Sequence, residues 1–167
     1  VLVRHEQCAA HMADGYARAT GRLGVCTSTS GPGSTNMITG VATAYVDSSP
    51  MLVLTGQVAT GMIGNNAFQE ADSFSLMMPI TKHNFRCLDP SDIPEAINRG
   101  VSIATTGRMG PVHVDLPSDV MNKQVPEEAF RQAFQMPPPL EDLSSIPDAI
   151  KMLKNAERPL LLVGRGV

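Results

Sequence analysis

Several features that mark other classes of protein are missing from this sequence of 167 residues. It has no tryptophan, its aromatic content is 4%, and no apolar run approaches the about 20 residues that cross a bilayer. The net charge of -3 gives no reason to expect nucleic acid or an anionic membrane as a partner. A hydrophobic content of 43% with 17% charged residues instead predicts a soluble globular protein.

Cysteine is also scarce, and its spacing excludes the common cysteine motifs. Cys8, Cys26 and Cys87 are odd in number and form no CxxC pair. We therefore expect buried, reduced thiols rather than disulfides or a metal site. No signal-peptide pattern is present, so the expected compartment is the cytoplasm.

The sequence has no GxGxxG after its first strand, which argues against a dinucleotide-binding module. Gly164-Arg165-Gly166 is only a partial match to that pattern. The chain opens within an expected apolar strand, Val1 to Val3, and closes on a strand that starts at Leu160 and enters a glycine-rich turn. These ends indicate a piece of a longer protein.

Helical and strand-like segments alternate along the first two thirds of the chain. Helices are expected over residues 5–20, 34–47 and 89–106, with a short one starting near Gln69; strands are expected over 24–28, 51–55, 82–87 and 112–116. This alternation predicts an α/β fold with a parallel β-sheet flanked by helices.

Proline then changes the character of the chain. Pro126 and the run Pro137-Pro138-Pro139 disfavour a helix and favour an extended spacer. We therefore expect one domain over residues 1–123, a linker over 124–141, and the start of a second α/β domain over 142–167, with a helix over 142–155.

Glu6 is the most informative single residue. It lies where the first apolar strand enters a helix, a place where burial can raise the pKa of a carboxyl and let it share a proton with a ligand nitrogen. The simpler interpretation is an acid that complements a helix dipole. Three loops at expected strand carboxyl ends favour a site, because parallel sheets bind ligands at that edge; these loops are residues 29–36, 56–72 and 107–120.

Together these pieces resemble the thiamine-diphosphate enzymes of the acetohydroxyacid (acetolactate) synthase group. The matching stretches are residues 4–7 (RHEQ), 11–18, 30–36 (SGPGSTN), 55–58 (TGQV), 67–72 (AFQEAD), 79–84 (PITKHN) and 110–112. They extend over essentially the whole chain, in the family's order. The resemblance implies the pyrimidine-binding domain over residues 1–123, without its first strand and helix.

The resemblance also implies roles for individual residues. Glu6 would be the catalytic glutamate that hydrogen-bonds the cofactor's aminopyrimidine, while Pro32 and Asn36 would flank the pyrimidine ring. Phe68 and Gln69 would line the substrate side of the site. Gln69 would be both a catalytic and a cofactor-binding residue. For Phe68 the alternative is ordinary core packing.

Other implied components lie partly outside the sequence. Arg108 would contact FAD, unless it is a solvated loop arginine. Mg²⁺ and the diphosphate would be bound through a GDG…N motif that this chain lacks, so the 167-residue piece is expected to have no turnover of its own. The full-length enzyme would act on 2-oxo acids as a homodimer or homotetramer, with a small regulatory subunit left open.

The implied reaction is decarboxylation of pyruvate on thiamine diphosphate, followed by condensation of the hydroxyethyl carbanion with a second 2-oxo acid, in branched-chain amino-acid biosynthesis. Two departures from the family pattern stand out: Ser118 replaces the usual lysine of the substrate channel, and Ala59 replaces a proline. The alternatives are sulfoacetaldehyde acetyltransferase, oxalyl-CoA decarboxylase, pyruvate oxidase, or a non-catalytic α/β binding module.

Overall fold

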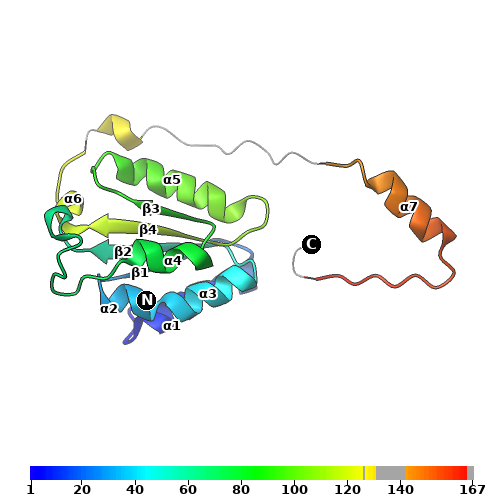
Figure 1. Cartoon of the computed structure of the whole chain (residues 1–167), viewed down its shortest axis with the longest axis horizontal. Coiled ribbons are helices and arrows are strands. Elements are labelled where there is room, and N and C mark those ends of the chain that lie inside the picture. Colours follow the sequence, from blue (N-terminus) through cyan, green and yellow to red (C-terminus); the bar gives the residue numbers. More distant parts are fainter. Residues whose placement is uncertain (126, 131–141, 165–167) are drawn as a thin grey trace. The chain divides into compact units, whose positions relative to one another are not determined.

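The computed structural model describes residues 1–125, 127–130 and 142–164. By internal contacts the chain divides into two compact units, residues 1–136 and 137–167. The first unit contains a four-stranded sheet, and all strand pairs in it are parallel (Figure 1). The strand order is β1-β2-β4-β3, formed by β1 (Gly24–Ser28), β2 (Met51–Gln57), β4 (Pro111–Pro117) and β3 (His83–Arg86). The expected parallel α/β sheet is therefore confirmed.

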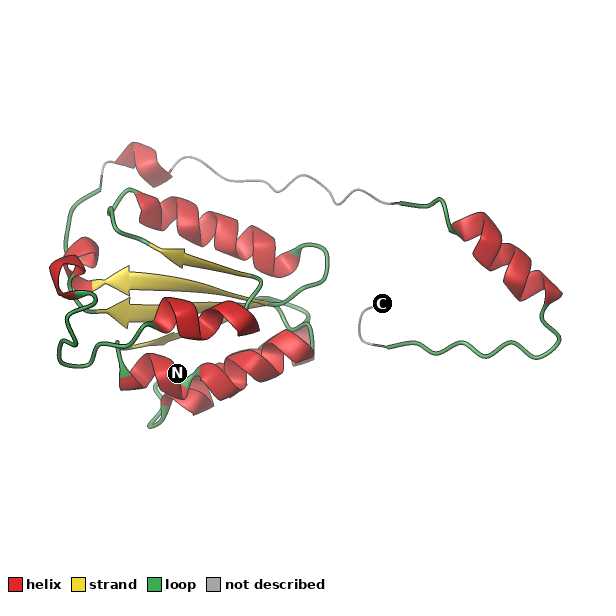
Figure 2. Cartoon of the chain, in the orientation of Figure 1, coloured by secondary structure: helices red, strands yellow, loops and turns green. Residues whose placement is uncertain are grey.

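Helices cover both faces of this sheet (Figure 2). One face carries α1 (Glu6–Thr20), α2 (Pro32–Asn36), α3 (Ile38–Val46) and α4 (Ser73–Met77), and the other carries α5 (Asp92–Thr105). Short segments complete the unit: η1 (Thr60–Met62), η2 (Met78–Ile80), α6 (Ser118–Met121) and η3 (Glu127–Phe130). Helix α1 ends as the sequence predicts, because Gly21 adopts φ +67 and donates its N–H to the carbonyl of Ala17 at 2.9 Å.

Alternate residues of β2 supply two separate cores. Met51 and Val53 pack with small residues of α1 and α3, whereas Leu52 packs with α5. Helix α1 lies very close to its neighbours, since a Cβ on Gly40 would lie 2.5 Å from the Cβ of Ala10. This close packing fixes the start of α1, and with it Glu6, against the carboxyl edge of the sheet.

Two expected strands are not observed among the described residues. Val1 and Leu2 are fully exposed, and Leu160 to Val163 are at least 70% exposed; neither segment has strand structure. An apolar run forms a strand only where a neighbour pairs with its backbone, and no described segment pairs with these. In the second unit, the expected helix is present as α7 (Ile146–Asn155).

Two helical predictions are corrected as well. The helix expected over residues 34–47 is two helices, α2 and α3, because Pro32 starts the first one early and the second begins after Met37. The short helix expected near Gln69 starts only at Ser73, since Gln69 has φ +56 and Asp72 caps α4.

The remaining structural predictions have mixed outcomes. Cys26 and Cys87 are buried, and burial raises the pKa of each thiol to about 12, but Cys8 is exposed. Among the helices that the structure describes, none combines the length and the apolar composition that a membrane-spanning helix needs. The proline run expected to form the linker, Pro137 to Pro139, lies outside the described residues.

Candidate functional site

The glycine–proline turn lies at the carboxyl end of β1. Gly31 has φ +57, a left-handed conformation that favours glycine, and Pro32 then opens α2. Buried Ser34 donates its hydroxyl to the carbonyl of Gly31 at 2.8 Å, and its Oγ lies 2.6 Å from Oγ of Ser73 at the start of α4. The turn is therefore held in place from both α2 and α4.

Glu6 is the first residue of α1 and is half-buried beside this turn. Nδ2 of Asn36 donates a hydrogen bond of 3.0 Å to Oε2 of Glu6. This bond, followed by a backbone N–H bond, lowers the pKa of Glu6, although burial opposes it. The predicted raised pKa is thus wrong in direction: the carboxyl lies at a helix start and accepts hydrogen bonds, and both features favour the ionised form.

The second carboxylate oxygen of Glu6 faces the turn. A Cβ on Gly33 would lie 3.5 Å from Oε1 of Glu6 and 2.7 Å from Cγ2 of Thr29. A side chain at position 33 would therefore clash with the methyl group of Thr29. Glycine here suits a flat ring that presents a nitrogen to Glu6, because residue 33 places no Cβ beside Oε1.

Gln69 comes to the same turn from a loop far along the sequence. A Cβ on Gly31 would lie only 2.4 Å from the carbonyl oxygen of Gln69, so the two backbones are in direct contact. The adjacent Phe68 is 87% exposed, which excludes the alternative that it packs in the core. The structure therefore brings Glu6, Pro32, Asn36 and Gln69 together around one turn, although they come from widely separated motifs. Their roles towards a cofactor stay predictions.

The loop that carries Gln69 has its own internal support. Its Glu70 carboxylate accepts hydrogen bonds from the backbone N–H groups of Gly64 and Ala67, the latter at 2.8 Å. These two bonds lower the pKa of Glu70. Near the start of the loop, the N–H and the hydroxyl of Thr60 both donate to the carboxylate of Asp119, at 2.9 and 2.7 Å.

Two of the predicted site residues, Ser118 and Arg108, have no described contact with the group around Glu6. Ser118 is exposed at the start of α6, next to Asp119. Arg108 precedes β4 and therefore lies at the amino edge of the sheet, opposite to Glu6. There it donates to Oγ of Ser48 at 3.0 Å and to the carbonyl of Tyr45 at 3.2 Å, which caps α3. The role of Arg108 towards FAD stays a prediction.

Below the site lies a buried polar network that the sequence analysis did not identify. Asp115 on β4 is fully buried and accepts hydrogen bonds from Thr55, Gln57 and Arg86. Burial raises the pKa of Asp115, and these three donors oppose the shift. The signal was present as polar residues at every second position of otherwise apolar strands, Thr55 and Gln57 in one and His113 and Asp115 in the other.

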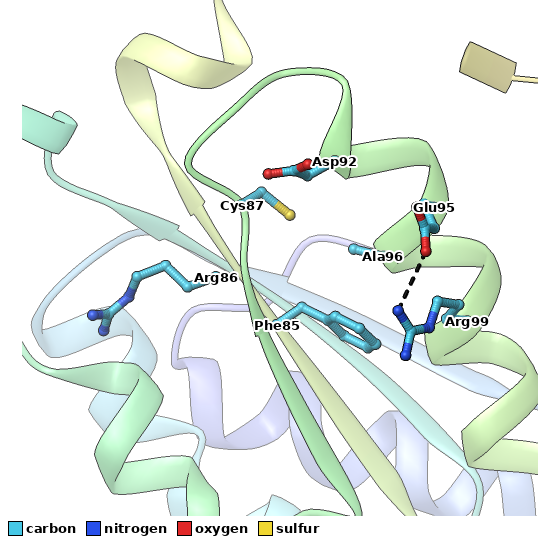
Figure 3. Close-up of a pocket in the computed structure, with 7 residues that line it drawn as sticks. All are labelled: Phe85, Arg86, Cys87, Asp92, Glu95, Ala96 and Arg99. Atoms are coloured by element: carbon cyan, nitrogen blue, oxygen red, sulfur yellow. Dashed lines mark hydrogen bonds and ion pairs between the residues drawn. The ribbon is translucent and has the colours of Figure 1, made fainter.

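A separate cavity of about 200 Å³ lies between β3 and α5 (Figure 3). Phe85 points towards α5, whereas the guanidinium of Arg86 extends to the opposite side of the strand (Figure 3), where it contacts Asp72 and Asp115. The cavity wall holds an ion pair of Glu95 and Arg99 at 3.2 Å. None of the residues grouped around Glu6 lines this cavity.

Metal ligands are not grouped in the described part of the chain, where no set of three or more His, Cys, Asp or Glu side chains could hold an ion. The prediction that Mg²⁺ is bound elsewhere in a longer polypeptide is not tested by this observation.

Comparison with known proteins places the chain in a family. Residues 1–76 match the model of the thiamine pyrophosphate enzyme N-terminal TPP-binding domain. The whole chain is 52% identical to the probable acetolactate synthase large subunit of Methanocaldococcus jannaschii and covers 29% of it. It is 47% identical to the acetolactate synthase large subunit of Corynebacterium glutamicum, over 100% of the chain and 27% of the relative. It is also 47% identical to the acetolactate synthase isozyme 3 large subunit of Escherichia coli, over 99% of the chain and 30% of the relative.

The chain thus spans less than a third of the length of these relatives. The motifs that carried the resemblance, the parallel sheet and the matched TPP-binding model agree with one another. The chain belongs to the thiamine pyrophosphate enzyme family and carries its N-terminal domain, in a form closely similar to that of acetolactate synthase large subunits.

Proposed function

We propose that this chain is the pyrimidine-binding part of an acetolactate synthase, which joins decarboxylated pyruvate to a second 2-oxo acid in branched-chain amino-acid biosynthesis. The observation that carries the proposal is the pairing of Glu6 with Asn36 beside the Gly31–Gly33 turn. The relatives named acetolactate synthase support the choice of reaction.

The residues present fit the pyrimidine end of thiamine diphosphate. The cofactor, when bound, would supply a C–H group whose conjugate base is a nucleophile towards the carbonyl of pyruvate, and an electron sink for the pair left by decarboxylation. Glu6 would hold and exchange a proton at the ring nitrogen opposite its carboxylate, and Asn36 keeps that carboxylate oriented and ionised. Pro32 would border the ring, and Gln69 would bound the substrate side.

The proposal extends to components that the described residues do not contain. Mg²⁺ and the diphosphate would be bound by another part of the full-length polypeptide, and Arg108 would contact FAD. The site would be completed in a homodimer or homotetramer, to which a small regulatory subunit could be added. We therefore expect the 167-residue chain by itself to be inactive, and the full-length enzyme to act in the cytoplasm.

Acetolactate formation from pyruvate tests this function directly. The full-length polypeptide would be supplied with thiamine diphosphate, Mg²⁺ and FAD, and compared with Glu6→Gln and with the exposed control Glu95→Gln. We expect product from the parent and the control, and a rate lower by about 100-fold or more in Glu6→Gln, as for removal of a general acid–base group. Equal rates in the parent and Glu6→Gln would refute the proposed role of Glu6.

Ser118 supports a second candidate within the same family. It replaces the lysine usual for the synthase, so this position itself carries no positive charge to bind a substrate carboxylate. If the parent bound thiamine diphosphate but made no acetolactate, sulfoacetaldehyde, oxalyl-CoA and pyruvate with oxygen would be tested as substrates. Acetolactate formation gained by Ser118→Lys would then identify this position as the determinant.

A further inference from the structure

Gln57 stands between the buried network and the substrate loop, residues 58–72. It is the last residue of β2 and only 3% exposed. Its Oε1 accepts from the N–H of Val58 at 2.9 Å, so its Nε2 is the donor end of the amide. Nε2 donates to the carbonyl of Ala71 at 2.9 Å and to Oδ2 of Asp115 at 3.3 Å. The amide therefore binds both ends of the substrate loop and the sheet beneath it.

A second connection runs from the same carboxylate to the same end of the loop. Nε of Arg86 lies 3.1 Å from Oδ2 of Asp115, and its Nη2 lies 2.8 Å from Oδ1 of Asp72. Asp72 also caps α4 by accepting from the N–H of Ser75 at 3.4 Å. Ala71 and Asp72 are thus both attached to one buried oxygen atom, once through Gln57 and once through Arg86.

These attachments lie two and three residues after Gln69, where the backbone has little freedom. Gln69 has φ +56 and touches Gly31 through its backbone, while Ser73 contacts Ser34 at 2.6 Å. A loop held on both sides of a left-handed residue presents its side chains in one arrangement. Neither attachment involves Glu6 or Asn36, so we expect the loss of one attachment to loosen the backbone at Gln69 and Phe68 and to leave those two side chains in place.

We propose that Gln57 is a positioning residue that fixes the substrate loop on Asp115, so that it sets the affinity for substrate and leaves proton transfer at Glu6 unchanged. The effect on substrate affinity rests on the function proposed above, whereas the attachment of the loop does not. Gln57 touches no residue grouped around Glu6 in the described contacts of its side chain. It acts through the loop.

The test uses Gln57→Met in the full-length polypeptide, because methionine keeps the length of the side chain and removes its polar atoms. We expect KM for pyruvate to rise about 10-fold, since small displacements of substrate-positioning groups have effects of this order, with kcat changed less than about twofold. Hydrogen exchange is expected to accelerate at the amides of Ala67, Glu70 and Ser73, which are hydrogen-bonded within the loop region.

Thr55→Val is the matched control. Thr55 is fully buried on the same strand and binds Asp115 at 3.1 Å, but it makes no hydrogen bond to the substrate loop in the described structure. It should leave both KM and loop exchange unchanged. Equal changes in the two variants, or a fall in kcat at constant KM in Gln57→Met, would overturn the proposal.

A second variant keeps the test decisive if Gln57→Met fails to fold. Asp72→Ala removes the other attachment at a side chain that is 59% exposed, and it should shift KM and exchange in the same direction by a smaller amount. Unchanged exchange in this variant would count against the attachment. Hydrogen exchange requires no substrate. If the parent made no acetolactate, the proposed reaction would be refuted. Faster exchange in the variants than in that parent would still support the fixing of the loop.

Discussion

The backbone of Gln69 lies directly against Gly31, and a Cβ on Gly31 would lie 2.4 Å from its carbonyl oxygen. Both residues have left-handed backbones, with φ +57 at Gly31 and φ +56 at Gln69. The contact joins two motifs that are separated by more than thirty residues in the sequence. It is the place where the glycine–proline turn and the substrate loop meet.

Gly31→Ala should therefore disturb both stability and cofactor binding. The left-handed conformation and the clash with Gln69 together predict a loss of about 3 kcal/mol in the free energy of unfolding. Gly21→Ala is the matched control, because Gly21 has φ +67 but no atom within 4 Å of its Cβ position, and it should cost only about 1 kcal/mol. Urea unfolding measures the loss of stability, and titration with thiamine diphosphate measures the loss of affinity for the cofactor. Equal losses in the two variants would contradict the close contact.

Asn36→Ala should change the pH dependence of the reaction. The hydrogen bond from Asn36 is the largest of the causes that lower the pKa of Glu6, so its removal raises that pKa. The acidic limb of the kcat/KM profile should then move to higher pH, because a larger fraction of Glu6 is protonated at a given pH. Thr35→Ala, on the same short helix, removes only a bond to the carbonyl of Pro32 and should leave the limb in place. An unmoved limb in Asn36→Ala would disprove the role of this bond.

The order of helices and strands could be predicted from the sequence because each element depends on local signals. Gly21 ends α1, and a continuous apolar run marks β2. Glu6 and Asn36 could be assigned to one site only through the family resemblance, since nothing in the intervening residues specifies that their side chains meet. The resemblance named residues that the structure brings to one turn, but also Arg108, which lies at the opposite edge of the sheet. The raised pKa expected for Glu6 came from its place at a strand–helix junction, and that expectation did not include the hydrogen bond from Asn36.

The buried network was missed for a different reason. Thr55 and Asp115 lie in apolar strands, where a polar residue at every second position is also typical of a strand with one exposed face. Helices cover both faces of this sheet, so these residues are buried and must bind one another. Val1 to Val3 show the opposite failure, because a strand-like sequence has no pairing partner in the described structure.

Glu70→Gln should loosen the substrate loop. A neutral amide accepts hydrogen bonds from Gly64 and Ala67 more weakly than a carboxylate does. We expect faster proteolytic cleavage between Gly61 and Ala67, where small and polar residues lie in an exposed loop. Glu95→Gln, which breaks only a surface pair with Arg99 at 3.2 Å, should leave cleavage unchanged. Equal cleavage rates in the two variants would show that Glu70 does not hold the loop.

His113 should make the fold sensitive to acid. It is fully buried on β4, and burial, assisted by the charge of Arg86, lowers its pKa from 6.5 to about 3. Its Nε2 lies 2.7 Å from Oγ1 of Thr55, which itself donates to Asp115. Nε2 must therefore carry the proton of a neutral ring, and protonation of Nδ1 would place an uncompensated charge in the core.

The sign of the pH effect follows from these two values of the pKa. Between about pH 3 and pH 6.5 the unfolded chain binds a proton at His113 that the folded chain does not, so stability falls as the pH falls through this range. From about pH 7.5 to about pH 5 this one residue should reduce the free energy of unfolding by about 2 kcal/mol. His113→Leu should flatten the pH dependence by that amount in urea unfolding of the same chain. A variant that loses as much stability as the parent over this range would show that His113 does not titrate on unfolding as its burial requires.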